Sequence, residues 1–124
     1  MCLEIVYRGK QKKEALAKLP ESGYYWKSVR YDGVEYSPGI RRHKPAFVAG
    51  WNETRGCYLG EGYNIAFHLY KNKREADWWT RHDVNGRRTI RCKVNKKDIV
   101  AIGEQIGLCI VTTQFWCPKP KIGD

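Results

Sequence analysis

The feature that most constrains this fold is a two-residue alternation of apolar and polar side chains in the second half of the chain. Residues 63–70 and 87–94 alternate most clearly. In 87–94 the apolar set is Ile90, Cys92 and Val94, and the polar set between them is Thr89, Arg91 and Lys93. A period of two places alternate side chains on opposite faces of a strand. Both segments are therefore predicted strands with one buried face.

Further strands and turns are predicted from local sequence patterns. Strands are expected at 2–7, 99–102 and 108–116, and Asp32-Gly33 predicts a hairpin between strands at 24–30 and 34–37. Asn85-Gly86 is a second turn, and 95–98 is expected to form a turn or one helical turn. The segment 38–62, rich in Pro, Gly and Arg, predicts mostly loop with at most one short strand.

Two short helices are expected. The spacing of Ala15, Leu16 and Leu19 predicts a helix over 10–19, ended by Pro20. Residues 72–81 predict a second helix, in which Asn72 and Glu75 form a capping-box-like pattern and Ala76 and Trp79 share the buried face.

Together these elements predict an α+β fold with a mainly antiparallel sheet of six to eight strands and two short helices. A chain of 124 residues suits one domain over 1–124, with 117–124 as a C-terminal tail. The expected core residues come from the apolar faces of these elements. They are Ile65, Phe67, Trp79, Ile90, Cys92, Val94, Ile110 and Phe115.

Several classes of protein are disfavoured. No apolar run reaches the length of a membrane span, and the N-terminus lacks a signal-peptide pattern, so a cytoplasmic protein without membrane contact is expected. The 5 cysteines are dispersed, and none forms Cys-x-x-Cys. This spacing predicts reduced thiols and neither a disulfide framework, a structural metal nor a cofactor.

Charge points to the class of partner. The formal net charge is +10, and residues 71–97 hold ten basic against three acidic residues, a net charge of +7. A field of this size favours nucleic acid, a nucleoprotein complex or an acidic protein surface. Solubility alone is the alternative explanation.

The candidate nucleic-acid-binding residues combine this basic segment with an aromatic side chain. Arg74 and Trp78 are four residues apart on the second predicted helix, which allows a cation–π contact. Arg91 and Lys93 share one face of the 87–94 strand, at a spacing suited to backbone phosphates. A second basic element lies in the 38–44 loop. The full predicted set is Arg41, Arg42, Lys44, Arg74, Trp78, Arg87, Arg88, Arg91, Lys93, Lys96 and Lys97.

Catalytic signals are weak. The chain has no nucleophile elbow, Walker A loop or dinucleotide fingerprint. His43, His68 and His82 are far apart, and His68 is expected to serve packing or one hydrogen bond. Cys57 has no neighbouring histidine to activate it. No catalytic residue is assigned.

Some residues suggest a family. Ala66-Phe67-His68-x-Tyr70, Glu75-Ala76, Ile90-x-Cys92-x-Val94 and Asp98-x-Val100-Ala101-x-Gly103 resemble a small family of cytosolic phage and prophage proteins, as does the start Met1-Cys2-Leu3. The resemblance covers 61–116 closely and 1–37 loosely. It implies a strand–helix–strand–turn–strand module and a mobile-element origin, and it implies no activity.

Tyr7-Arg8-Gly9 also resembles the first-strand arginine of ADP-ribosyltransferases. Such enzymes need a catalytic glutamate and a Ser-Thr-Ser strand. Here Gly103-Glu104-Gln105-Ile106 is expected to be a loop, and Ser-Thr-Ser is absent.

Three functions therefore remain open. The first is non-catalytic binding of nucleic acid or a nucleoprotein complex by a small basic phage-type protein. The second is a mobile-element inhibitor or accessory protein that binds an acidic host-protein surface. The third is an ADP-ribosyltransferase-like enzyme. The sequence gives no oligomeric state.

Overall fold

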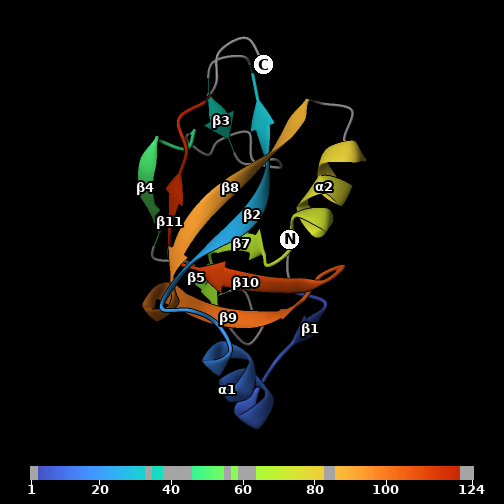
Figure 1. Ribbon diagram of the computed structural model, residues 1–124, viewed down its shortest axis with the longest axis vertical. Coiled ribbons are helices and arrows are strands. Elements are labelled where there is room, and N and C mark those ends of the chain that lie inside the picture. Colours follow the sequence, from blue (N-terminus) through green and yellow to red (C-terminus); the bar gives the residue numbers. More distant parts are fainter. Residues whose placement is uncertain are drawn as a thin grey trace.

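The computed structural model describes residues 3–32, 35–37, 46–54, 57–58, 64–82 and 86–120. The described chain forms two helices and a mainly antiparallel sheet, which confirms the predicted α+β class (Figure 1). The helices are α1 (Gly9–Ala17) and α2 (Lys73–Arg81), and a 3₁₀ turn, η1, spans Lys96–Asp98. The strands are β1 (Ile5–Val6), β2 (Ser22–Tyr31), β3 (Tyr36–Ser37), β4 (Gly50–Glu53), β5 (Cys57–Tyr58), β6 (Asn64–Ile65), β7 (Phe67–Tyr70), β8 (Arg87–Asn95), β9 (Ile99–Glu104), β10 (Leu108–Thr112) and β11 (Gln114–Cys117).

The main sheet has 9 strands, in the order β1-β9-β10-β7-β2-β8-β11-β4, with β3 paired to β2. The predicted hairpin at 24–37 is confirmed as β2–β3, in which Tyr31 lies opposite Tyr36. β5 and β6 form a separate pair. In Figure 1, β9 and β10 lie across the lower half, whereas β2, β8, β11 and β4 lie steeply inclined above them, so the sheet turns sharply.

The strand number exceeds the predicted range, since two expected strands are each divided and β4 and β5 form within 38–62. The expected strand 63–70 becomes β6 and β7. The expected strand 108–116 becomes β10 and β11, which break at Thr113. There the carbonyl of Asp98 accepts hydrogen bonds from the Thr113 amide at 3.0 Å and the Thr112 hydroxyl at 3.1 Å. At these bonds the chain leaves β10, which pairs with β9 and β7, and enters β11, which pairs with β8 and β4.

Two apolar clusters lie on opposite faces of the sheet. The inner face carries the larger cluster, which includes Tyr25, Val29, Ile102, Ile110 and Phe115. The outer face carries the smaller cluster beneath α2, with Ala76 fully buried and Trp79 packed at its margin. This confirms the predicted buried face of the second helix. The expected core residue Ile65 lies outside the described side chains.

Hydroxyl groups fix α2 to the outer face. The Thr80 hydroxyl lies 2.9 Å from that of Ser28 on β2 and 2.7 Å from that of Thr89 on β8. The predicted capping box is wrong, because Asn72 precedes α2 without a side-chain capping bond. Glu75 is instead buried, with its carboxylate against Gly107 in the β9–β10 turn.

Candidate nucleic-acid interface

Four side chains form a line across the outer face of the sheet, at the end away from Thr80. Trp116 of β11 lies opposite Trp51 of β4 on one side and opposite Lys93 of β8 on the other. Lys93 in turn lies opposite Tyr24 of β2. The aromatic members are exposed, with 45% of Trp51, 37% of Trp116 and 51% of Tyr24 open to solvent. We call these four residues the aromatic row.

The row faces outward because its members alternate with core residues. A side chain between two inward-facing neighbours on a strand points to the other face of the sheet. The buried neighbours of the row are Tyr25, Cys92, Val94, Phe115 and Cys117. Packing of the inner face thus holds the row on the outer face.

Cations lie against the aromatic rings of this face. The Arg91 guanidinium lies 4.4 Å from the centroid of the Tyr24 ring. The Lys73 ammonium lies 5.9 Å from the centroid of the Trp26 ring. Trp26 belongs to β2 and lies opposite Arg91 of β8. Rings and positive charges therefore alternate along the surface, and this combination suits stacked bases joined by phosphates.

The structure divides the predicted basic cluster of β8. Arg91 and Lys93 share the outer face, as predicted. Arg87 lies on that face too, but its Nη1 donates a hydrogen bond of 3.1 Å to the Ser28 carbonyl. Arg88 points to the inner side, where its guanidinium lies 4.1 Å from the centroid of the Tyr31 ring. Arg87, Arg88 and Arg91 thus do not all point to the same face of the sheet.

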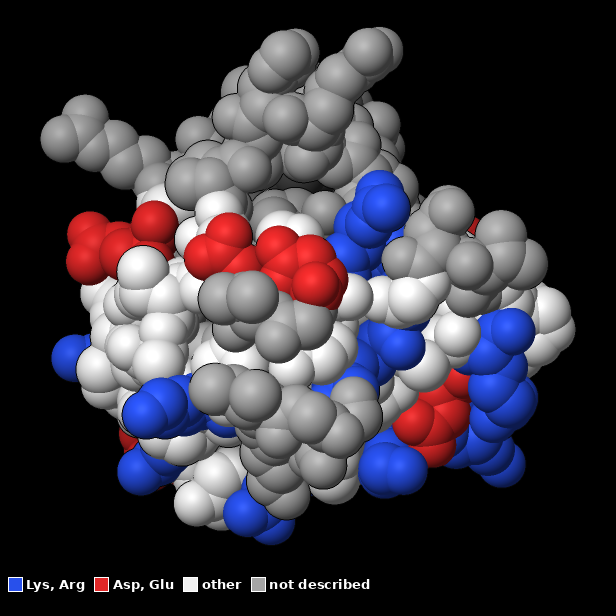
Figure 2. Space-filling model, turned by 90° about the horizontal axis from the view of Figure 1, so that it is seen from above, with Lys and Arg blue, Asp and Glu red and all other residues white. Residues whose placement is uncertain are grey.

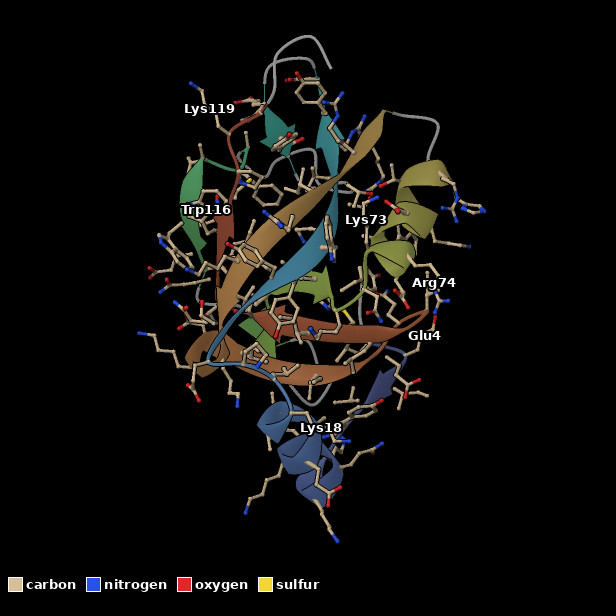
Figure 3. The ribbon with its side chains drawn as sticks, viewed as in Figure 1. Glu4, Lys18, Lys73, Arg74, Trp116 and Lys119 are labelled. Atoms are coloured by element: carbon tan, nitrogen blue, oxygen red, sulfur yellow. The ribbon has the colours of Figure 1, made fainter. Side chains whose placement is uncertain are left out.

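The predicted residues of α2 lie apart from the aromatic row. Trp78 stacks on His82, with ring centroids 4.2 Å apart, in place of the expected contact with Arg74. The Arg74 guanidinium is 3.7 Å from the Glu75 carboxylate and is otherwise exposed. Figure 3 shows Arg74 and Trp116 on opposite sides of β8.

Of the remaining predicted residues, two lie within the described part of the chain and three do not. Lys96 and Lys97 lie in η1, beyond the C-terminal end of β8, and Lys96 is 4.0 Å from Glu21. Arg41, Arg42 and Lys44 lie outside the described residues. Figure 2, which views the molecule from above, shows basic side chains in separate groups with acidic groups between them. Among the described residues seen on that side, the basic side chains do not form one continuous face.

Sequence reasoning missed the three aromatic members of the row. Trp51 falls in the segment expected to be mostly loop, and Trp116 falls in a strand expected to be continuous. Tyr24 begins an expected strand. The available signal was the alternation of each residue with apolar neighbours, but only the register of four strands aligns them.

His68 and the buried thiols are held in unreactive forms. Burial lowers the pKa of His68 to about 4, and its Nδ1 lies 3.2 Å from the Ala66 carbonyl. The predicted packing role of His68 fits this geometry. Burial raises the pKa of Cys117 to about 11 and that of Cys109 to about 12. His43 and the Cys57 side chain lie outside the described part of the chain.

Arg8, the residue that resembles the transferase arginine, is exposed just before α1. Gly103 and Glu104, expected in a loop, belong to β9, and the Tyr7 hydroxyl donates to Glu104 Oε2 at 2.7 Å. Among the described residues no group of three His, Cys, Asp or Glu side chains is placed to hold a metal ion. Within the same residues, every helix falls short of the length and apolar character needed to cross a bilayer.

Comparison of the chain with protein-family models, with curated proteins and with solved structures gives no match. The resemblance to phage proteins therefore stays a prediction.

Proposed function

We propose that this protein binds single-stranded nucleic acid, alone or within a nucleoprotein complex, on the aromatic row. The observation that carries the proposal is the alignment of Trp51, Trp116, Lys93 and Tyr24 in one line across four strands, with its three rings exposed. Large aromatic side chains on a sheet surface stack with bases, and cations among them neutralise the backbone. A phage-type origin remains part of this proposal.

The spacing of the row supports a single strand. Trp116 and Tyr24 are separated by β8, which places their backbones roughly 10 Å apart across the sheet. Lys93 lies between them. A base stacked on each ring leaves the connecting backbone over the Lys93 ammonium, and paired bases of a duplex do not expose their faces for such stacking.

Binding of a fluorescent single-stranded oligonucleotide, followed by anisotropy at several salt concentrations, tests the proposal. Each phosphate contact on a single strand contributes about 0.7 to the slope of log affinity against log salt. Lys93→Ala and Arg91→Ala are each expected to reduce the slope by about that amount. Arg87→Ala is expected to leave it unchanged, because Arg87 is six residues from Lys93 along β8, roughly 20 Å from the row.

Aromatic variants are expected to behave differently. Trp116→Ala should weaken binding by about fivefold to a hundredfold, since a stacked base contributes about 1–3 kcal/mol, and should leave the salt slope unchanged. Trp116→Phe retains a stacking face and should recover most of the loss. Ile5→Ala, at an apolar residue 53% exposed on the opposite edge strand, and Lys13→Ala on α1 are the matched controls.

Two outcomes contradict the proposal. One is the absence of binding at low salt. The other is binding that Trp116→Ala and Lys93→Ala leave intact. Binding of an acidic protein surface that these variants weaken, with no competition from RNA or DNA, would support the alternative of a mobile-element accessory protein.

A further inference from the structure

A cleft opens where β8 and β11 diverge. β8 pairs with β2 along its whole length, but its pairing with β11 is confined to Lys93 and Trp116. Pro118 follows β11 and has no backbone N–H with which to extend the pairing. The space between the strands has a volume of about 310 Å³ and is bounded by Arg88–Arg91 of β8, Tyr36 of β3, and Pro118 and Lys119.

The lining of this cleft is strongly basic. It includes Arg88, Arg91 and Lys119, and no carboxylate stands among the described residues that line it. Arg88 and Arg91 lie on opposite faces of β8, so they bring positive charge to the cleft from both sides of the strand. The Arg88 guanidinium stacks on Tyr31, which orients its side chain.

The cleft is continuous with the aromatic row. Arg91 lines the cleft and also stacks on Tyr24, a member of the row. Lys119 is three residues beyond Trp116, and Figure 3 shows both on the same side of the molecule. Tyr24 is one end of the row, so a terminal base stacked on Tyr24 lies beside Arg91 and the cleft.

We propose that the cleft holds a terminal phosphate, so that the preferred ligand of the aromatic row is a single strand with a phosphorylated end. This inference rests on the proposed function. Three cations exceed the single negative charge of a phosphodiester, whereas a phosphate monoester carries nearly two charges at neutral pH. Arginine pairs with such a group in a bidentate manner. The volume lies at the lower limit for small-molecule sites, which suits one nucleotide.

The test uses three internally labelled oligonucleotides of one sequence, with a 5′-phosphate, a 3′-phosphate or hydroxyl groups at both ends. One phosphorylated form is expected to bind about tenfold more tightly than the hydroxyl form at low salt, as expected for hydrogen bonds between charged groups. Lys119→Ala and Arg88→Ala should remove this preference, whereas Lys13→Ala should keep it. Trp116→Ala should weaken all three ligands by the same factor.

The outcomes separate this inference from the proposed function. Equal binding of all three oligonucleotides, or a preference that survives Lys119→Ala, overturns the terminal-phosphate site and leaves the proposed function intact.

If no oligonucleotide binds, titration with a nucleoside monophosphate and with inorganic phosphate, followed by NMR, tests the cleft directly. Changes in the NMR chemical shifts of Arg88 and Arg91 would support a phosphate site without a strand-binding row. The absence of such changes would overturn both proposals. Competition by an acidic peptide but not by phosphate would also overturn the inference.

Discussion

The Lys27 ammonium donates a hydrogen bond of 2.8 Å to the backbone carbonyl of His68 within the inner face of the sheet. It also lies 5.8 Å from the centroid of the Phe47 ring and 5.9 Å from that of Phe115. Burial lowers the pKa of Lys27 from 10.5 to about 8. A cation inside the main apolar cluster makes the stability of this fold dependent on pH.

The first prediction concerns that dependence. Below the folded-state pKa of about 8 the lysine is charged in both states, and the cost of burying the charge is fully present. As pH rises from there toward 10.5, the folded protein loses the proton while the unfolded chain keeps it, so the contribution of Lys27 to the free energy of unfolding increases. Between about pH 7 and pH 9.5 the gain is on the order of 2 kcal/mol.

Urea unfolding of the protein and of Lys27→Met at both pH values measures this gain. The variant lacks the titrating group, so its stability should rise less, or fall more, than that of the parent. Tyrosines and thiols titrate in both proteins, so the difference between the two pH responses removes their effect. An identical pH response of the two proteins would show that Lys27 does not titrate in this range.

The second prediction concerns the hydroxyl groups beneath α2. Thr80→Val keeps the shape of the side chain but removes the oxygen shared with Ser28 and Thr89. The two remaining hydroxyls lose a partner in a partly buried site, and a loss of about 1–3 kcal/mol in the free energy of unfolding is expected. Thr80→Ser keeps the oxygen and should lose less. Equal losses in urea titrations of the two variants would argue against the hydrogen bonds as the cause.

The third prediction couples α2 to the β9–β10 turn. A methyl group at Gly107 would overlap the Glu75 carboxylate, so Gly107→Ala should destabilise the fold by about 1–3 kcal/mol. In a Glu75→Ala background the overlap is absent and the cost should largely disappear. A Glu75→Gln background keeps the shape of the side chain and should retain the cost. Additive losses in the Glu75→Ala background would contradict this packing relation.

The fourth prediction concerns the buried thiols. Cys92, Cys109 and Cys117 are free and buried, and burial raises the pKa of each. Since the thiolate is the reactive form, iodoacetamide should label these positions slowly in the folded protein and rapidly in urea. Peptide mass spectrometry measures the labelling. Rapid labelling of Cys92 without denaturant would contradict the packing of β8.

The sequence predicted β8 well and the surface around it incompletely. Alternation alone was sufficient to place Arg91 and Lys93 on the face of the sheet away from Ile90, because a period of two is a local property of a strand. In an unbroken strand, Ile110 and Phe115 would lie on opposite faces, yet both are buried on the inner face. The break between them depends on hydrogen bonds to the distant Asp98 carbonyl, which no local pattern encodes.

The break at Thr113 also bears on how this surface can change. Because Trp116 and Phe115 are neighbours, one residue inserted or deleted between Thr113 and Phe115 would exchange their faces, putting the indole into the core and the benzyl group into water. A substitution alters one ring of the row at a time. An insertion or deletion at this point instead moves Trp116 from the outer face to the inner face in a single step. Sequences that share this fold and ligand should therefore tolerate substitution of Trp116 by other aromatic residues far better than any insertion or deletion beside it.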